Sequence, residues 1–229
     1  MAVDEALLHS ALQGGLPSLR FYRWSQPTLS LGYFQHYTDR GLHPPSYDCR
    51  VVRRASGGGA ILHDHELTYS LTLPVDDRWS ARATDLYQQV HSALVWALAA
   101  WGVDAYLRGK HNVASPEKPF LCFLRQAAGD VVLQGRKIAG SAQRRVQGAV
   151  LQHGSLLLRT SHCAPELPGL EELTGLRFDR RELARSWASM LAEKLHVDFT
   201  TGALSAGENT RAQGFAQQRF GETRWTHRR

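Results

Sequence analysis

Three consecutive glycines in the first third of the chain constrain its fold more than any other feature. They lie in the stretch Arg-Arg-Ala-Ser-Gly-Gly-Gly-Ala at residues 53–60, and a short Ala-Ile-Leu strand leads out of it. Without Cβ atoms, such a loop can adopt positive φ angles, and a ligand can approach its main-chain N–H groups closely. The two arginines before it could each offer five donors to an anion. Alternatively, the stretch is a glycine-rich hairpin turn with solvated arginines.

The glycine stretch does not match the common nucleotide-binding loops. No Gly-Lys-Ser or Gly-Lys-Thr follows it, as a P-loop requires. No Gly-x-Gly-x-x-Gly opens a helix either. The loop alone therefore does not indicate that its ligand is a nucleotide.

Length and composition indicate one globular domain. The chain has 229 residues, of which 43% are hydrophobic and 21% charged, as in ordinary folded proteins. No apolar run approaches the roughly 18 residues of a membrane-spanning helix. No basic-then-apolar segment follows Met1. We therefore expect a cytoplasmic protein that does not associate with membranes.

The basic charge of the chain concerns its partners. The formal net charge is +6 and the sequence pI is about 9.5. Nucleic acid is one partner that such a charge suggests, but the basic residues are dispersed and form no run of the 5–8 residues typical of nucleic-acid patches. An enzyme that docks acidic protein domains explains the charge as well. We expect no nucleic-acid partner.

The cysteines and histidines give little sign of disulfides or metal. The three cysteines, Cys49, Cys122 and Cys163, are odd in number and form no Cys-x-x-Cys pair. Reduced thiols are therefore expected, and one of them could be a nucleophile. The His-Asp-His run at residues 63–65 lacks a third ligand at zinc spacing, so we expect no metal site.

The apolar pattern predicts an α+β arrangement in which strands cluster around two helices. Helices are expected at residues 2–13, 86–101 and 181–195, the second with Asp85 as its N-cap. Strands are expected at residues 19–24, 28–33, 50–54, 67–73 and 149–158 and on both sides of Gln134-Gly135. We expect the first two strands to pair around a Gln26-Pro27 turn. The last thirty residues are polar and basic, and a short helix and a loose tail are expected there.

Two later segments complete a family pattern. Asp-Val-Val-Leu-Gln-Gly-Arg-Lys-Ile-Ala-Gly-Ser-Ala-Gln-Arg-Arg occupies residues 130–145, and Gln-His-Gly-Ser-Leu-Leu-Leu occupies residues 152–158. With the glycine stretch and its following His-Asp, these blocks closely resemble the lipoate/biotin protein ligase catalytic family, in family order and spacing. The resemblance implies a single α+β catalytic domain over residues 1–229, with mixed or antiparallel sheets and packed helices. Two departures are a first family strand that looks missing and no room for the C-terminal accessory domain of many ligases.

Cys122 distinguishes between branches of this family. It lies in Phe-Leu-Cys-Phe at residues 120–123, fifteen positions before Lys137. A Cys-Phe pair at this point resembles the cysteine-dependent octanoyltransferase branch. The resemblance implies that the thiol takes an octanoyl group from acyl carrier protein. The acyl group would then pass to the lysine of a lipoyl domain, such as the glycine cleavage H protein or a 2-oxoacid dehydrogenase E2, without a cofactor.

The chemistry of this step favours a thiolate with a cation beside it. A thiolate attacks a thioester readily, and a positive neighbour favours that form of the thiol. Lys137 is the expected cation, so Cys122 and Lys137 are the expected catalytic pair. The alternative for Cys122 is a buried small hydrophobic residue. Cys49 and Cys163 have no such context and are expected to be structural or surface thiols.

The remaining motif residues are expected to bind the substrate. Main-chain N–H groups of the glycines could stabilise an oxyanion. Small residues after Lys137 would leave room for a ligand tail or an incoming lysine, and an apolar tunnel should end near the catalytic pair. His63 could orient polar groups or could be a satisfied strand-end histidine. The expected substrate-binding residues are Arg54, Ser56, Gly57, Gly58, Gly59, His63, Gly140, Ser141, Ala142, His153 and Gly154.

Two other functions stay open at this point. An ATP-dependent lipoate–protein ligase would use Lys137 and the glycine loop to bind an acyl-adenylate, with ATP and Mg²⁺. A non-catalytic binding protein on the same scaffold is the other alternative. Octanoylation assays with and without ATP and Mg²⁺ separate these functions.

Overall fold

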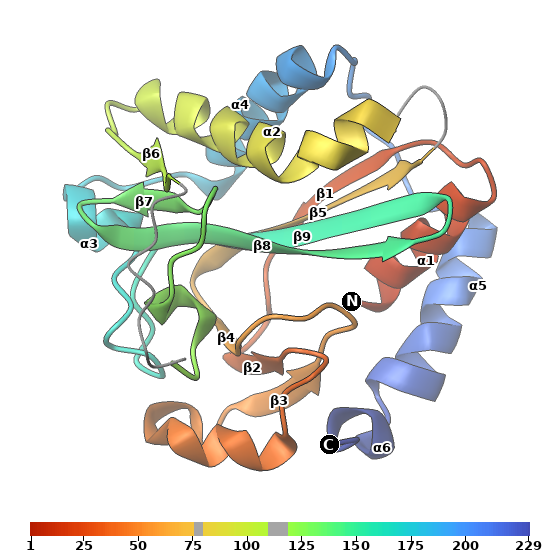
Figure 1. The fold of residues 1–229 in the computed structure, drawn as a ribbon, viewed down its shortest axis with the longest axis horizontal. Helices are drawn as coiled ribbons and strands as arrows, with labels where there is room; N and C mark the ends of the chain where they lie inside the picture. Colours follow the sequence, from red (N-terminus) through yellow and green to blue (C-terminus); the bar gives the residue numbers. More distant parts are fainter. Residues whose placement is uncertain (76–79, 110–118) are drawn as a thin grey trace.

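The structure is a computed structural model that describes residues 1–75, 80–109 and 119–229, with the side chains of residues 80–84 left out. The expected loop at Lys118-Pro119 lies partly outside the described residues. Figure 1 shows a long twisted sheet with two helices on one face and a smaller sheet beyond the other face. This arrangement confirms the α+β prediction.

Six strands form the large sheet, and every neighbouring pair in it is antiparallel. Across the sheet, the strands are β1 (Ser18–Tyr22), β5 (Glu66–Pro74), β9 (Ala149–Leu157), β8 (Arg136–Val146), β7 (Val131–Leu133) and β6 (Tyr106–Leu107). All nine residues of β5 are buried, because protein covers both faces of this central strand. The turn between β7 and β8 has positive φ at both Gln134 and Gly135, the hairpin turn whose twist matches that of the flanking strands.

The small sheet corrects one pairing expected from the sequence. It contains β3 (Arg50–Arg53), β2 (Thr28–Leu31) and β4 (Ile61–His63), with β2 in the middle. The expected hairpin between residues 19–24 and 28–33 is wrong, because β1 joins the large sheet and β2 pairs with β3 and β4. All four residues of β2 are buried, as suits a strand paired on both edges. The segment between β1 and β2 therefore crosses from one sheet to the other.

Helices α2 (Ser80–Ala99) and α4 (Arg180–Leu195) cover one face of the large sheet (Figure 1). Because α2 begins at Ser80, the expected N-cap at Asp85 is wrong. Asp179 caps α4, and its carboxylate accepts hydrogen bonds from two backbone N–H groups of the first turn. Trp187 of α4 is 1% exposed, packs edge-on against Tyr69 of β5, and donates its indole N–H to a backbone carbonyl of α2. This core fixes the strands that carry the site.

Alternate residues of β9 enter different cores. Val150 and Leu156 pack with α2 and α4, whereas Ala149 and Leu151 pack against α1 (Ala2–Leu12). Leu157 belongs to the core of the small sheet. The period-two pattern thus separates a helical face from a second face, which α1 and the small sheet share.

The C-terminal segment is not the loose tail that its polar sequence suggests. It contains α5 (Ala206–Phe215), a π-helical turn η4 (Ala216–Phe220) and α6 (Thr223–Thr226), and α5 lies along α1 (Figure 1). Arg53 donates from Nε and Nη2 to the carbonyl of Thr226, at 3.0 and 2.9 Å. Trp225 Nε1 donates to the carbonyl of Arg53 at 2.9 Å. Buried polar contacts, which an apolar pattern does not reveal, hold this segment.

The remaining elements are short. They are α3 (Leu170–Thr174) and the 3₁₀ turns η1 (Tyr37–Leu42), η2 (Pro44–Ser46) and η3 (Cys122–Leu124). None of the helices in the described part of the chain is long and apolar enough to span a membrane.

Candidate active site

Two sequence-distant motifs meet between the sheets. The backbone N–H of Ala60, which follows the three glycines, donates to the carbonyl of Phe120 at 3.0 Å. The N–H of Cys122 donates to the carbonyl of Ala60 at 2.7 Å. These bonds form a single parallel bridge between Ala60 and Leu121. They place the thiol, at the start of η3, directly beside the exit of the glycine loop.

Cys122 and Lys137 form a close pair, as the sequence predicts. Lys137 Nζ lies 3.8 Å from Cys122 Sγ and 2.9 Å from Asp130 Oδ2. Asp130 is fully buried, and its two oxygens accept hydrogen bonds from the Tyr87 hydroxyl and the Ala127 N–H, both at 2.7 Å. The carboxylate is therefore fixed from two sides, and it holds the ammonium group within reach of the thiol. Asp130 and Tyr87 are site residues that the sequence reasoning missed.

A β-bulge turns Lys137 toward the thiol. Val131 pairs with Ala139, but Val132 pairs with Lys137, so Ile138 has no partner on β7. Ile138 and Ala139 are adjacent in the chain, yet both lie in the helix-covered core. Strict alternation would place Lys137 on that core face with Ala139. The extra residue moves its side chain to the opposite face, beside Gly140.

Gly140 is small because Lys137 occupies the space beside it. A Cβ on Gly140 would lie 2.4 Å from Lys137 Cε and 2.7 Å from its Nζ. The expected passage for a ligand tail at Gly140 is therefore taken, in this structure, by the chain's own lysine. Gly154 is small for a similar reason, since its Cβ would lie 2.3 Å from Ser141 Oγ and 2.5 Å from the carbonyl of Gly140.

The pairing of β8 with β9 brings the two later motifs together. Gly140, Ser141 and Ala142 lie opposite Ser155, Gly154 and His153 respectively. Ser155 shares the second face with Gly140, is buried, and has a hydroxyl without a partner among the described residues. An unpartnered buried hydroxyl is costly, so Ser155 is a candidate ligand-binding group. The sequence signal for it, the serine of His-Gly-Ser, was present but unused.

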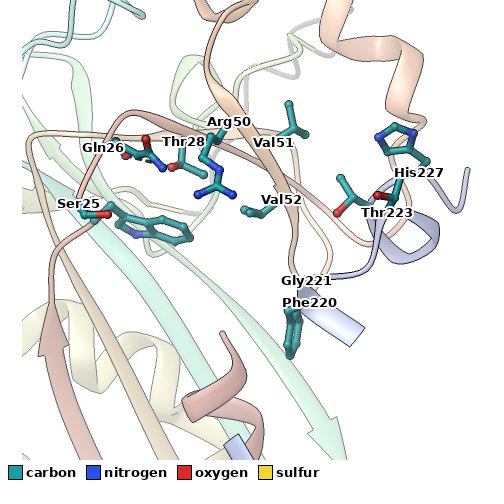
Figure 2. A pocket seen from close by; sticks show the side chains of 12 residues that line it. Ser25, Gln26, Thr28, Arg50, Val51, Val52, Phe220, Gly221, Thr223 and His227 are labelled. Carbon is teal, nitrogen blue, oxygen red and sulfur yellow. Dashed lines mark hydrogen bonds between the residues drawn. The ribbon is translucent and has the colours of Figure 1, made fainter. Parts of the chain in front are cut away.

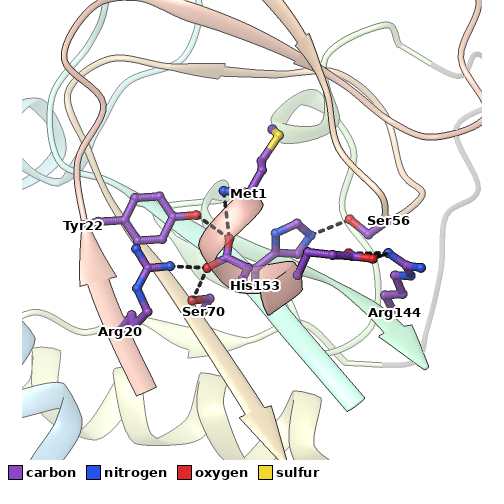
Figure 3. A network of polar contacts seen from close by, with 9 residues as sticks. Met1, Arg20, Tyr22, Ser56, Ser70, Arg144 and His153 are labelled. Carbon is purple, nitrogen blue, oxygen red and sulfur yellow. Dashed lines mark hydrogen bonds and ion pairs between the residues drawn. The ribbon is translucent and has the colours of Figure 1, made fainter. Parts of the chain in front are cut away.

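His153 connects the sheet to the glycine loop. Its Nε2 forms a hydrogen bond with Ser56 Oγ. Burial lowers the pKa of His153 to about 4, although the carboxylate of Asp4 favours the protonated ring. The ring is therefore neutral near pH 7. Figure 3 shows the ring of His153 between Ser56 and a hydrogen-bond network at α1. In this network, the carboxylate of Asp4 accepts hydrogen bonds from Arg20, Tyr22 and Ser70.

The hydroxyl of Ser141 belongs to a buried chain of hydrogen bonds. His91 Nδ1 donates to the carbonyl of Gly129, so its Nε2 accepts from Ser141, both at 2.6 Å. Ser141 Oγ in turn accepts from the hydroxyl of Tyr69 at 2.6 Å, and that hydroxyl accepts from Gln152 at 2.7 Å. Burial lowers the pKa of His91 to about 4, which keeps the ring neutral for this role. Ser141 thereby ties β8 to α2.

The two arginines before the glycine loop hold backbone carbonyls. Arg54 is buried, and its Nη2 donates to the carbonyls of Gly57 and Gly59 at 2.8 and 2.7 Å. Its Nη1 donates to the carbonyl of Ser30 at 2.8 Å. Arg53 is fully buried and donates to carbonyls of the 32–35 turn and the C-terminal segment. These contacts fix the loop, because buried guanidiniums need acceptors. A substrate-binding role for Arg54 stays a prediction.

His63 has partners of its own at the end of β4. Its Nδ1 lies 2.8 Å from Glu66 Oε1, and the ring of Trp24 stacks on it at 4.3 Å between centroids. Although burial opposes ionisation, His63 and the Asp64 N–H hold the pKa of Glu66 below its ordinary value. This is the geometry of the satisfied strand-end histidine. A substrate-binding role for His63 stays a prediction.

The other two cysteines lie together in the core of the small sheet. Cys49 and Cys163 are 8% and 7% exposed. Burial, and then the neighbouring Cys163, raises the pKa of Cys49 to about 12. A thiol of this kind is a poor nucleophile near neutral pH.

Two cavities lie away from these residues. One of about 420 Å³ lies between β3 and the C-terminal segment, where Figure 2 shows Arg50, Val52, Thr223 and His227 around it. Another, of about 620 Å³, lies between α3 and the end of α2. Neither is lined by any of the expected site residues, so the apolar tunnel stays a prediction. The described residues contain no cluster of three or more His, Cys, Asp or Glu suited to a metal ion.

The chain is similar in sequence to named octanoyltransferases. The octanoyltransferase LipM of Oceanobacillus iheyensis is 39% identical over 164 residues, which cover 69% of this chain and 59% of that protein. The matched part thus spans less than two thirds of that relative. The octanoyltransferase LipM of Brevibacillus brevis is 30% identical over 266 residues, covering 100% of this chain and 94% of that protein.

The fold itself matches a solved structure. A bipartite lipoate protein ligase from Thermoplasma acidophilum has a TM-score of 0.78 and 23% identity, over 99% of this chain and 89% of that chain. Residues 1–167, which contain all three motifs, match the family described as the lipoyl protein ligase A/B catalytic domain. The chain belongs to the lipoyl protein ligase A/B catalytic domain family.

Proposed function

We propose that this protein transfers an octanoyl group from acyl carrier protein, through a thioester on Cys122, to the lysine of a lipoyl domain. The observation that carries the proposal is the Cys122 Sγ at 3.8 Å from Lys137 Nζ, beside the glycine loop. The octanoyltransferases among the relatives support the acyl group. A ligase acting through an acyl-adenylate needs no thiol at this place.

In the first step, the Cys122 thiolate attacks the carbonyl carbon of the donor thioester. The bond from this carbon to Cys122 Sγ forms, and the bond to the donor sulfur breaks. The Lys137 ammonium gives its proton to the departing donor thiolate. Asp130, held by Tyr87 and the Ala127 N–H, keeps Lys137 in place during this transfer.

In the second step, the neutral amine of the acceptor lysine attacks the Cys122 thioester. The carbon–nitrogen bond forms, the carbon–sulfur bond breaks, and Cys122 leaves as a thiolate. The proton released by the amine returns to Lys137, so the enzyme ends in its starting state. The Ser155 hydroxyl and N–H groups of the glycine loop are the candidate donors to the carbonyl oxygen in both steps.

The thioester is the testable intermediate. After incubation with octanoyl-acyl carrier protein, intact-mass spectrometry should show one octanoyl adduct, and peptide mapping should place it on Cys122. Cys122→Ser should abolish octanoylation of a lipoyl domain, whereas the buried thiols give matched controls in Cys49→Ser and Cys163→Ser, which should retain it. An adduct on Cys49 or Cys163, or none at all, would contradict the proposal.

The energy source separates the transferase from the ligase. Transfer between a thioester and an amine needs no further activation, so omission of ATP and Mg²⁺ should not change the rate. Free octanoate or lipoate with ATP and Mg²⁺ should be a poor donor. Efficient ATP-dependent ligation that survives in Cys122→Ser would identify a ligase instead.

A further inference from the structure

The glycine loop has an exposed rim on both sides, and each side pairs an apolar side chain with arginine. A Cβ on Gly57 would lie 3.6 Å from the ring of Phe34, which is 65% exposed. A Cβ on Gly59 would lie 3.0 Å from Arg125 Nη2, and the preceding Leu124 is 43% exposed. The C-terminal arginines extend the first side. We call these residues the cationic rim: Phe34, Leu124, Arg125, Arg228 and Arg229.

Aromatic rings hold the C-terminal arginines at this place. The guanidinium carbon of Arg228 lies 4.2 Å from the ring centroid of Tyr33 and 5.0 Å from that of Trp225. The guanidinium carbon of Arg229 lies 5.5 Å from the Phe34 ring centroid. The carbonyl of Arg229 also accepts a hydrogen bond from the N–H of Tyr37 at 2.7 Å. The two charges are therefore positioned rather than free.

The positive charge of the rim is poorly compensated within the chain. Among residues 1–75, 80–109 and 119–229, no carboxylate forms an ion pair with Arg125, Arg228 or Arg229. Burial, and then the charges of Arg228 and Arg229, lowers the pKa of the Arg53 guanidinium, with Asp39 acting in the opposite direction. Like charges gathered at one place repel one another, and an acidic partner relieves this repulsion.

Resting on the proposed function, we propose that the cationic rim docks an acidic face of the acyl-accepting lipoyl domain. The length of the arm that carries the reacting group in each substrate indicates that the rim docks the acceptor and not the donor. A lysine carries its amine on a stem of only four carbons, so the accepting domain must bind close to Cys122. A thioester donor on a longer flexible arm can dock further away. Phe34 and Leu124 supply the apolar contacts of such an interface, with arginines around them.

Measuring the two half-reactions separately tests this docking. Cys122 is first loaded from a small thioester, octanoyl-N-acetylcysteamine, and transfer to a lipoyl domain is then followed in a single turnover. In Arg228→Glu/Arg229→Glu, the acceptor concentration for half-maximal transfer should rise by about tenfold or more. The doubly neutral Arg228→Gln/Arg229→Gln should lie between this variant and the wild type. Loading of Cys122, and release of the octanoyl group by hydroxylamine, should remain at wild-type rates, which also shows that the variants fold.

A matched comparison makes the result specific. Arg181→Glu/Arg185→Glu makes the same change in charge at exposed positions of α4, on the other face of the large sheet, and should not alter transfer. An unchanged acceptor dependence in Arg228→Glu/Arg229→Glu would overturn the docking proposal, as would slower loading from acyl carrier protein with normal transfer. If wild-type Cys122 accepts no octanoyl group, the proposed function fails before the rim is tested.

Discussion

At the scale of single residues, Ile138, which has no pairing partner on β7, sets the face of the sheet on which the side chain of Lys137 lies. Because the bulge at Ile138 moves Lys137 to the thiol side of the sheet, the ammonium group can lie between Cys122 and Asp130. Gly140 leaves the space that this position needs. The position of Lys137 beside the thiol therefore depends on a residue without a side chain.

This dependence predicts the behaviour of Lys137→Met and Gly140→Ala. In a background of Cys49→Ser/Cys163→Ser, both variants should slow the alkylation of Cys122 by iodoacetamide near pH 7 by about tenfold, since a lost or displaced cation no longer favours the thiolate. At high pH, where every thiol is ionised, the rates should converge. Gly140→Ala should also lower the free energy of unfolding, because its Cβ displaces the Lys137 ammonium and leaves the buried Asp130 carboxylate without its ion-pair partner. Superimposable profiles of Lys137→Met and the parent would show that Lys137 does not activate Cys122.

The sequence predicted that Cys122 and Lys137 lie together, because the family resemblance of their motifs pairs them, and the two side chains are close in the structure. It missed Asp130 and Tyr87, because their contacts depend on the bulge and on how α2 lies over the sheet. The sequence also could not reveal the acceptors of Arg54, since an arginine beside glycines looks the same whether it contacts an anion or backbone carbonyls. Only the path of the loop reveals that the acceptors are Gly57 and Gly59.

At the scale of elements, α2 is bonded to the sheet through a buried neutral histidine. The folded pKa of His91 is about 4, against 6.5 for an ordinary histidine. Below pH 6.5 the unfolded chain takes up a proton at His91 that the folded chain does not. The contribution of the neutral ring to the free energy of unfolding is therefore full above pH 6.5 and is lost as the pH falls toward 4. At about 1.4 kcal/mol per pKa unit, the loss from His91 is on the order of 3 kcal/mol.

Urea unfolding at pH 7 and at pH 4 measures this effect. The fall in unfolding free energy between the two pH values should be smaller in His91→Gln than in the wild type by on the order of 3 kcal/mol. His196→Gln, at an exposed position, should leave the fall unchanged. An equal fall in His91→Gln and wild type would mean that His91 does not carry this pH dependence.

The bounds of elements with a strong apolar pattern were predicted well, but the strands with which they pair were not. Helix α4 and strands β5 and β9 lie close to their expected bounds, because the apolar residues of each recur regularly along the sequence. The pattern of β2 is equally apolar, but it does not state which sheet receives the strand. The C-terminal helices were underestimated, since their attachment comes from arginine, tryptophan and backbone carbonyls.

At the scale of the whole molecule, one buried glutamate joins the first helix to both the sheet and the C-terminal segment. Glu5 of α1 is 2% exposed, and it accepts hydrogen bonds from Arg144 of β8 at 2.6 Å and from Arg219 of η4 at 2.9 Å. Figure 3 shows Arg144 reaching this network. Removing one partner of a buried ion pair leaves the other charges without compensation.

Glu5→Gln should therefore lower the free energy of unfolding by about 1–3 kcal/mol, less than for a fully buried pair because both arginines are about a quarter exposed. Urea unfolding at pH 7 measures the change. Glu193→Gln, at an exposed position of α4, is the matched control and should have an effect of about 0.5 kcal/mol or less. Equal effects of the two variants would show that Glu5 does not join these parts.

The hydrogen bonds from Arg53 to Thr226 have a consequence for the order of events during synthesis. The two residues are 173 positions apart in the chain. A ribosome releases the glycine loop, the thiol and the lysine long before residue 226 leaves the exit tunnel, and the nascent chain folds from its N-terminal side. Until then, Arg53 lacks the acceptor that anchors the strand entering the loop. The candidate nucleophile Cys122 therefore leaves the ribosome before the strand that enters the glycine loop has all of its anchoring contacts.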